Sequence, residues 1–126
     1  MSAAAAPKPM RGEVWLAILD PVLANEQGGV RPVVIVSRDS FNQGGSGLVI
    51  AIPMTTRERG LAFHVPIAPP DGGLRRRSFM KCEDIRSLSV IRLIERWGNV
   101  SPDTMLVLDD RLRMMLVLPS NRGIGL

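Results

Sequence analysis

Arg31, in the stretch "NEQGGVRPVVIVS" (residues 25–37), is the side chain best placed for chemistry on an anion. A residue before proline is driven out of the helical region, so Pro32 holds Arg31 in an extended backbone where an apolar run begins. Gly28 and Gly29, just upstream, permit backbone angles that other residues avoid. A guanidinium binds phosphate or carboxylate through two parallel hydrogen bonds from its planar group of donors. The stretch therefore predicts an anion site at the start of a strand.

Three further stretches carry polar groups next to apolar runs: "TTRER" (55–59), "KCED" (81–84) and "RRR" (75–77). Thr55 follows an apolar run directly, so its hydroxyl either faces a groove or caps the turn. The arginine run is either a solvated loop or a set of phosphate contacts. The sequence leaves both pairs of alternatives open.

We expect no metal site and no cofactor. The single histidine and single cysteine cannot supply the usual zinc ligands, and no acidic cluster resembles a calcium or magnesium loop. Cys82 could in principle be a nucleophile with His64 as its base. A buried, unreactive thiol is the more common role, and His64 lies in a strand pattern that favours a surface or packing role.

The composition indicates one folded domain with a basic surface. The chain has 126 residues, of which 45% are hydrophobic and 22% charged, and a net charge of +4. Its bases are 14 arginines and 2 lysines, a ratio that also arises from GC-rich coding. Positive charge favours nucleic acid or an acidic protein as partner.

No apolar stretch reaches the roughly 18 residues of a membrane span, and the opening "MSAAAAPKPM" lacks the apolar core of a signal peptide. With a lone cysteine, these features predict a cytoplasmic protein without a membrane partner. We divide the chain into a disordered leader (1–10), one domain (11–118) and a flexible tail (119–126).

The apolar pattern predicts a mainly β fold. Val33 to Val36 are β-formers without polar alternation, so this strand should be covered on both faces. Strands are expected over 11–19, 31–37, 48–54, 61–68, 78–84 and 94–100. Residues 85–93 are ambiguous, and the loop 38–47 has room for one helical turn.

A single helix should follow the strands. Ser101, Pro102 and Asp103 form a typical helix start, and Pro119 should end the helix. One face is apolar at spacings of three and four, through Met105, Leu108, Leu112 and Met115. Short strands closed by one amphipathic helix predict a small barrel or curled sheet.

Four stretches in this order resemble the MazF/PemK/Kid toxins of bacterial toxin–antitoxin systems: "RGEVWLAILDP", "EQGGVRPVVIVS", "PMTT" and "KCEDIRSLSVIRL". The resemblance runs from about residue 11 to 118. It implies an SH3-like curled barrel of the MazF/CcdB type, assembled as a homodimer. It also implies a sequence-specific, metal-independent endoribonuclease that cuts single-stranded mRNA, inhibits translation and is neutralised by an acidic MazE-like antitoxin.

Carried over residue by residue, the resemblance makes Arg31 and Thr55 the catalytic pair, with Glu26 and Glu83 as candidate general bases. It implies RNA contacts by Gln27, Thr56, Arg57, Lys81 and Arg86. This chain departs from some family members at Asn25, where they carry a histidine. It departs again at Lys81-Cys82-Glu83, where they carry Arg-Cys-Asp.

Two other functions stay open at this point. A non-catalytic inhibitor like the gyrase poison CcdB has a similar fold but acts by binding a protein. A nucleic-acid-binding module without enzymatic action would bind in a salt-dependent way without cutting. Arg31 and Thr55 favour the nuclease.

Overall fold

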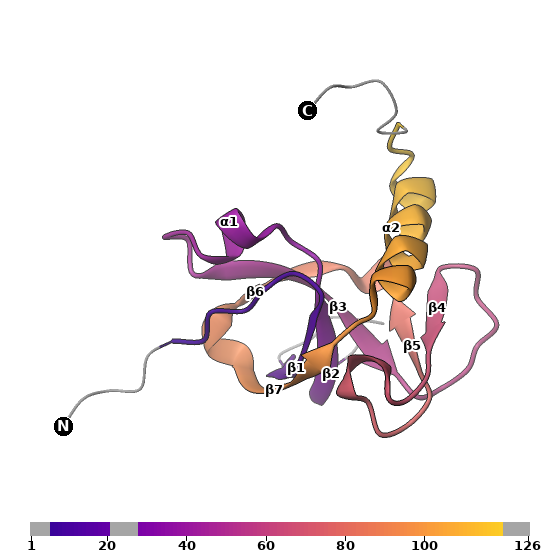
Figure 1. Ribbon diagram of the computed structural model, residues 1–126, viewed down its shortest axis with the longest axis horizontal. Coiled ribbons are helices and arrows are strands. Elements are labelled where there is room, and N and C mark those ends of the chain that lie inside the picture. Colours follow the sequence, from indigo (N-terminus) through magenta and orange to yellow (C-terminus); the bar gives the residue numbers. More distant parts are fainter. Residues whose placement is uncertain (1–5, 21–27, 120–126) are drawn as a thin grey trace.

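A curled antiparallel sheet with one long helix against it forms the domain in the computed structural model, which describes residues 6–20 and 28–119 (Figure 1). The strand order is β4-β5-β3-β2-β1-β7, and β6 also pairs with β3. The predicted fold class, mainly β with a C-terminal helix, is confirmed. The strands are β1 (Glu13–Ile18), β2 (Val30–Ile35), β3 (Leu48–Thr55), β4 (His64–Ile67), β5 (Ser78–Lys81), β6 (Arg86–Ser89) and β7 (Leu93–Asn99).

The helical elements are few and mostly short. They are α1 (Asp39–Asn42), α2 (Pro102–Leu116) and the 3₁₀ turns η1 (Asp71–Gly73), η2 (Cys82–Asp84) and η3 (Val90–Arg92). None of the helices in the described part of the chain has the length and apolar character that crossing a membrane requires.

The apolar half of β2, residues 33–35, is buried on both faces, as the unbroken apolar run predicts. Val34 packs with Ile52 of β3 in one core cluster, which also contains Leu108 of α2. Val33 packs with Ala51 in the second cluster, on the other face. Each cluster thus takes alternate residues of the same two strands, because successive strand side chains point to opposite faces.

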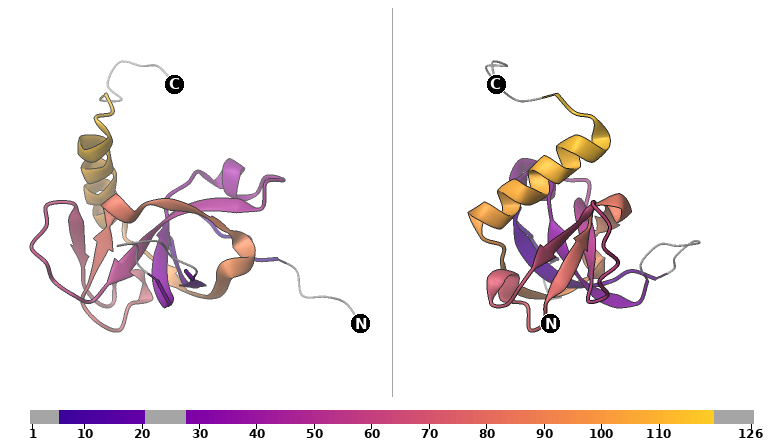
Figure 2. Two further views of the ribbon diagram at one scale, coloured as in Figure 1. Left: turned by 180° about the vertical axis from the view of Figure 1, so that it is seen from behind. Right: turned by 90° about the vertical axis from the view of Figure 1, so that its right-hand side faces the viewer.

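Helix α2 begins where the sequence predicts. The Ser101 hydroxyl accepts a hydrogen bond from the Thr104 backbone N–H at 3.3 Å, and Asp71 of η1 accepts one from the Ser101 N–H at 2.7 Å. Leu108 is fully buried, and Met105, Leu112 and Met115 pack partly buried around the same cluster. The helix stands over the β4–β5 end of the sheet, as the two further views show (Figure 2).

Helix α2 ends at Leu116, before Pro119, where the sequence predicts its end. The helix stops there because Val117 adopts the left-handed conformation with φ 56°.

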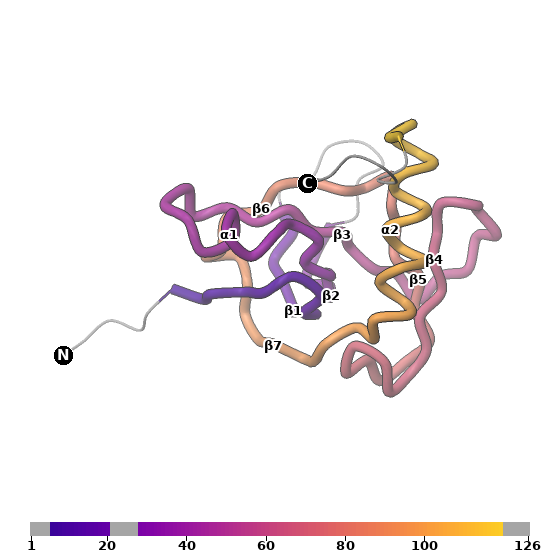
Figure 3. Tube along the Cα trace, turned by 45° about the horizontal axis from the view of Figure 1, so that its top comes forward, coloured from indigo at the N-terminus to yellow at the C-terminus, as the bar shows by residue number. Residues whose placement is uncertain are grey.

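The segment before β1 is fixed to the rest of the fold by contacts at Arg11 and Pro9. Arg11 pairs with Asp109 of α2 at 2.6 Å. Pro9, which we assigned to the leader, is buried; its carbonyl accepts from Gln43 at 2.9 Å, where the chain runs beside α1 (Figure 3).

The limits of the predicted strands differ from those in the structure by up to three residues. The strand expected over 78–84 ends at Lys81, because Cys82–Asp84 closes into the turn η2. The strand expected over 61–68 begins only at His64, and the one over 11–19 only at Glu13. The ambiguous stretch 85–93 divides into β6, η3 and the first residue of β7, and the helical turn in 38–47 is α1.

Candidate nucleic-acid site

Arg31 and Thr55 share one face of the sheet. Val33 of β2 pairs with Pro53 of β3 in antiparallel register, so positions 31 and 55 fall opposite each other two residues further along. Because strand side chains alternate between faces, both residues point to the same side as Val33 and Pro53. Arg31 is exposed, and its Nε donates to the Gly28 carbonyl at 3.3 Å.

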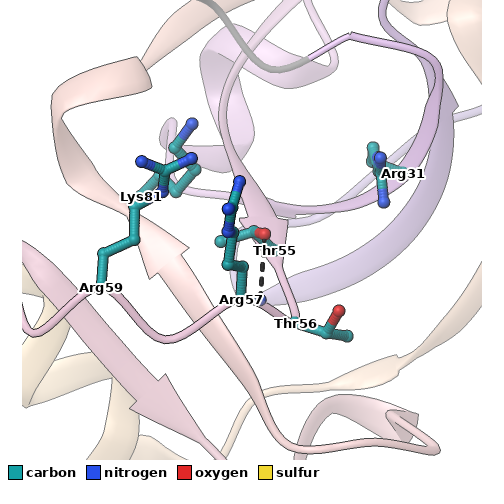
Figure 4. Close-up of a pocket in the computed structure, with 6 residues that line it drawn as sticks. All are labelled: Arg31, Thr55, Thr56, Arg57, Arg59 and Lys81. Carbon is teal, nitrogen blue, oxygen red and sulfur yellow. Dashed lines mark hydrogen bonds between the residues drawn. The ribbon is translucent and has the colours of Figure 1, made fainter.

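Thr55 both caps the turn and faces a pocket. Its Oγ1 accepts a hydrogen bond from the Arg57 backbone N–H at 3.2 Å, the dashed line in Figure 4. The same residue lines the pocket that Arg31 lines. The two alternatives that the sequence left open for Thr55 are therefore compatible, since a hydroxyl that accepts one hydrogen bond still has a proton to donate.

This pocket has a volume of about 270 Å³ and a strongly cationic wall. Thr55 lies in its middle, with Arg59 and Lys81 to one side and Arg31 to the other (Figure 4). Its full lining is Arg31, Thr55, Thr56, Arg57, Arg59 and Lys81. Because four of these side chains are cations and none is a carboxylate, the pocket is suited to an anion such as a phosphodiester.

Asp84, which was not predicted as a site residue, lies between the cations on the adjoining strands. Its carboxylate lies 2.7 Å from Arg86 Nη2 and 3.9 Å from Lys81 Nζ, and all three side chains are at most 15% exposed. Arg86 pairs with Ala51 of β3 and so faces the same side as Arg31. The Lys-x-x-Asp-x-Arg spacing could have indicated this network, because η2 folds the acid back between the two bases.

Arg86 and Glu83 lie outside the lining of the pocket. The Glu83 carboxylate is 2.7 Å from His64 Nε2, and His64 is 2% exposed at its side chain. His64 is thus a packing residue, as expected. Glu26, Gln27 and Asn25 lie outside the described residues.

Cys82 is a buried thiol, the more common of the two roles considered for it. Burial raises its pKa to about 11, and the charge of Glu83 adds to the rise. At neutral pH the thiol is protonated and so is a poor nucleophile. Within residues 6–20 and 28–119, no group of three or more His, Cys, Asp or Glu side chains is placed to hold a metal ion.

The arginine run 75–77 is not simply a solvated loop. The Arg75 guanidinium lies 5.6 Å from the ring centre of Trp97, and that of Arg77 lies 5.0 Å from the ring centre of Phe79. Cation–π contact orders both side chains. Neither Trp97 nor this pairing was predicted from the sequence.

The class of protein that this fold and site define is the toxin component of a type II toxin–antitoxin system. The family model of PemK-like, MazF-like toxins of type II toxin–antitoxin systems matches residues 10–116. The chain therefore belongs to that family.

Individual relatives agree with this assignment. Endoribonuclease EndoA of Bacillus subtilis (strain 168) is 34% identical over 109 residues, which cover 86% of this chain and 94% of the relative. MazF from Deinococcus radiodurans superposes with a TM-score of 0.78 at 27% identity, covering 88% of this chain and 98% of that one. A mycobacterial endoribonuclease in complex with its cognate antitoxin superposes with a TM-score of 0.73 at 28% identity, covering 89% and 98%.

Proposed function

We propose that this chain is a sequence-specific endoribonuclease that cuts single-stranded mRNA without a metal ion and thereby inhibits translation in the cytoplasm. The observation that carries the proposal is the common face of Arg31 and Thr55 in a pocket whose charged side chains are all cations. The 34% identity to an endoribonuclease supports it over a CcdB-like inhibitor of a protein target.

The reaction is attack of the RNA's own 2′-hydroxyl on the neighbouring phosphorus. The 2′-oxygen gives its proton to the general base and bonds to phosphorus, and the bond to the 5′-oxygen breaks. The 5′-oxygen takes up a proton from water, which leaves a 2′,3′-cyclic phosphate and a 5′-hydroxyl. Negative charge builds on the phosphoryl oxygens in the transition state. Arg31, set on an extended backbone by Pro32, stabilises that charge without rearranging.

Thr55 donates a hydrogen bond from its hydroxyl to a phosphoryl oxygen, and Arg57 and Lys81 hold the RNA backbone on either side. Thr56 adds a further hydroxyl at the rim, and Arg86 extends the cationic surface along β6. Gln27, which precedes β2 in the sequence, contacts a base or sugar. The general base is a carboxylate. We favour Glu26 over Glu83, because Glu83 already pairs with His64 and lies outside the pocket lining.

An acidic antitoxin binds over the same cationic pocket and neutralises the enzyme. A mycobacterial relative has been solved in complex with its cognate antitoxin. Helix α2 offers an apolar surface for such a partner or for a second copy of the chain. The exposed apolar side chains on and just after it are Leu106, Val107, Met114, Leu116, Val117 and Leu118. We expect a homodimer, and light scattering that gives the mass of one 13.8 kDa chain would contradict this.

The central experiment is cleavage of a defined single-stranded RNA by the purified protein in excess EDTA. The proposal expects cuts at a short sequence with 2′,3′-cyclic phosphate ends. Activity that disappears with EDTA and returns with magnesium would refute the metal-independent mechanism. Salt-dependent binding without any cleavage would instead support a binding module.

A further inference from the structure

A second, smaller pocket adjoins the cationic one at Thr56. It has a volume of about 180 Å³, and its walls are mostly apolar. Its lining is Pro32, Thr56, Leu74, Arg75, Arg76, Ser78 and Trp97. Drug-sized ligands occupy roughly 300–1,000 Å³, so this pocket is suited to a single planar ring system.

The position of the second pocket relates it to the first. Pro32 directly follows Arg31, and Thr56 directly follows Thr55. Arg31 and Pro32 are consecutive residues of β2, so their side chains face opposite sides of the sheet, and the second pocket opens around the end of β2 from the first. Thr56 lines both pockets and marks the point where a bound chain would pass from one to the other.

A β-bulge places Trp97 in this pocket. Val14 of β1 pairs with Gly98 of β7, but the next residue, Trp15, pairs with Arg96, so Trp97 is an extra residue in β7. Bulges commonly redirect a side chain next to a functional site. The Trp97 ring packs against the core cluster of Val34 and carries the Arg75 guanidinium 5.6 Å from its centre.

The turn that leads into Leu74 and Arg75 packs closely against β7 at Trp97. Gly72 and Gly73 adopt φ of 68° and 71°, and a Cβ on Gly73 would lie 2.1 Å from the Trp97 carbonyl oxygen. Only glycine allows the η1 backbone to approach β7 this closely. Leu74 is then buried, and Arg75 follows it directly, so the pocket is formed before any ligand arrives.

We propose that this pocket binds a nucleobase of the RNA substrate close to the cleaved bond, and that Trp97 and Arg75 form its stacking platform. The inference rests on the proposed ribonuclease function. Every base has a flat π-face that stacks on aromatic rings and guanidinium planes, and apolar walls exclude water from it. The phosphate lies in the cationic pocket while the base turns past Thr56 into the apolar one.

The test uses RNAs that carry one abasic nucleotide in turn at the two positions on either side of the cleavage site. At one position, loss of the base should slow wild-type cleavage roughly five- to 100-fold, mainly through KM. Trp97→Leu should cut intact RNA more slowly than wild type but be insensitive to that abasic position. Arg75→Ala should be slowed less than wild type by loss of the base at that position. Arg77→Ala removes the same charge from the same loop outside the pocket and should keep the wild-type profile.

A fluorescence measurement does not depend on cleavage or on the stability of Trp97→Leu. The chain has two tryptophans, so Trp15→Phe leaves Trp97 as the sole reporter. A 2′-deoxy substitution at the attacking sugar makes the RNA uncleavable. This RNA should quench Trp97 on binding, and the same RNA lacking the critical base should bind with little quenching.

The outcomes separate the two proposals. The base pocket would be overturned if wild type and folded Trp97→Leu were slowed equally by each abasic position. It would also be overturned if all abasic RNAs quenched Trp97 equally. Either result would leave the ribonuclease proposal intact. If wild type cuts no RNA at all, the ribonuclease proposal fails, and the base pocket fails with it as a subsite for substrate.

Discussion

Arg31 and Thr55 stand opposite each other at the ends of β2 and β3, on the face that also carries Lys81 and Arg86. The pairing Val33–Pro53 sets the first relationship, and the pairings Thr55–Phe79 and Ala51–Arg86 set the others. One curled strand, β3, therefore aligns polar groups from three neighbours. The proposed chemistry depends on this alignment.

Arg31→Ala should lower kcat/KM by about 100- to 1,000-fold, as expected when one preorganised donor to transition-state charge is lost. Arg31→Lys should recover only part, because lysine lacks the planar fork. The Arg31 side chain is exposed, so the circular dichroism spectrum should not change. Arg38→Ala, an exposed arginine outside the pocket, is the control; an equal loss in that variant would indicate a general charge effect.

Thr55→Val should reduce kcat strongly, since valine keeps the shape but removes the hydroxyl, whereas Thr55→Ser should retain most activity. Thr55→Val also removes the acceptor for the Arg57 N–H, so it should destabilise the fold by about 1 kcal/mol. Thermal unfolding separates the two effects. Full activity in Thr55→Val would show that its hydroxyl serves only the turn.

Glu26→Gln should slow cleavage by about 100- to 10,000-fold, the usual contribution of a positioned general base. It should also abolish the fall in rate at acidic pH that protonation of this carboxylate causes. Glu83→Gln should have a much smaller effect, because that carboxylate pairs with His64. A pH–rate profile of both variants measures this, and the opposite ranking would assign the base to Glu83.

Asp84→Asn should destabilise the protein by about 3 kcal/mol, because it removes the charge that balances the nearly buried Arg86 and Lys81. We also expect lower affinity for RNA, since Lys81 would lose its ion pair with Asp84 beside the pocket. Denaturant titration and RNA binding measure the two effects. Asp110→Asn, at an exposed pair with Arg113, should change stability by less than about 1 kcal/mol.

Glu13 should make the fold sensitive to acid. Burial raises its pKa, but hydrogen bonds from the Met10 N–H, Trp15 and Arg96 outweigh that effect, so the net pKa lies below the ordinary value of 4.5. A carboxyl whose pKa is lowered on folding stabilises the native state above its unfolded pKa. That stability is lost as the pH falls through the folded pKa.

Glu13→Gln should therefore be less stable than wild type at neutral pH, and the difference should shrink below about pH 4.5. Thermal melts from pH 7 to pH 3 measure it. Glu95→Gln, on an exposed residue of β7, should follow the wild-type curve. A gap between Glu13→Gln and wild type that stays constant in acid would contradict the assignment.

The sequence by itself predicted most of the local elements and suggested the candidate catalytic residues. The β-branched run after Pro32 has a strong strand preference, and Ser101-Pro102 carries its own helix start. Arg31 was recognisable because proline fixes the backbone of the residue before it. Arg31 and Thr55 were named from local chemistry and family resemblance, and neither requires knowledge of a distant contact.

Only the tertiary structure decided which of these groups meet. The antiparallel register, set by burial of Val33 and Ala51 on one face and Val34 and Ile52 on the other, places position 31 opposite position 55. The Asp84 network depends on the turn η2 closing where the sequence favours a strand. The Trp97 pocket depends on a bulge that is defined only by pairing with β1. The register and the bulge arise from contacts between segments far apart in the chain, and local propensity carries no information about them. The Asp84 network joins residues close in sequence, but it forms only because η2 turns the chain back.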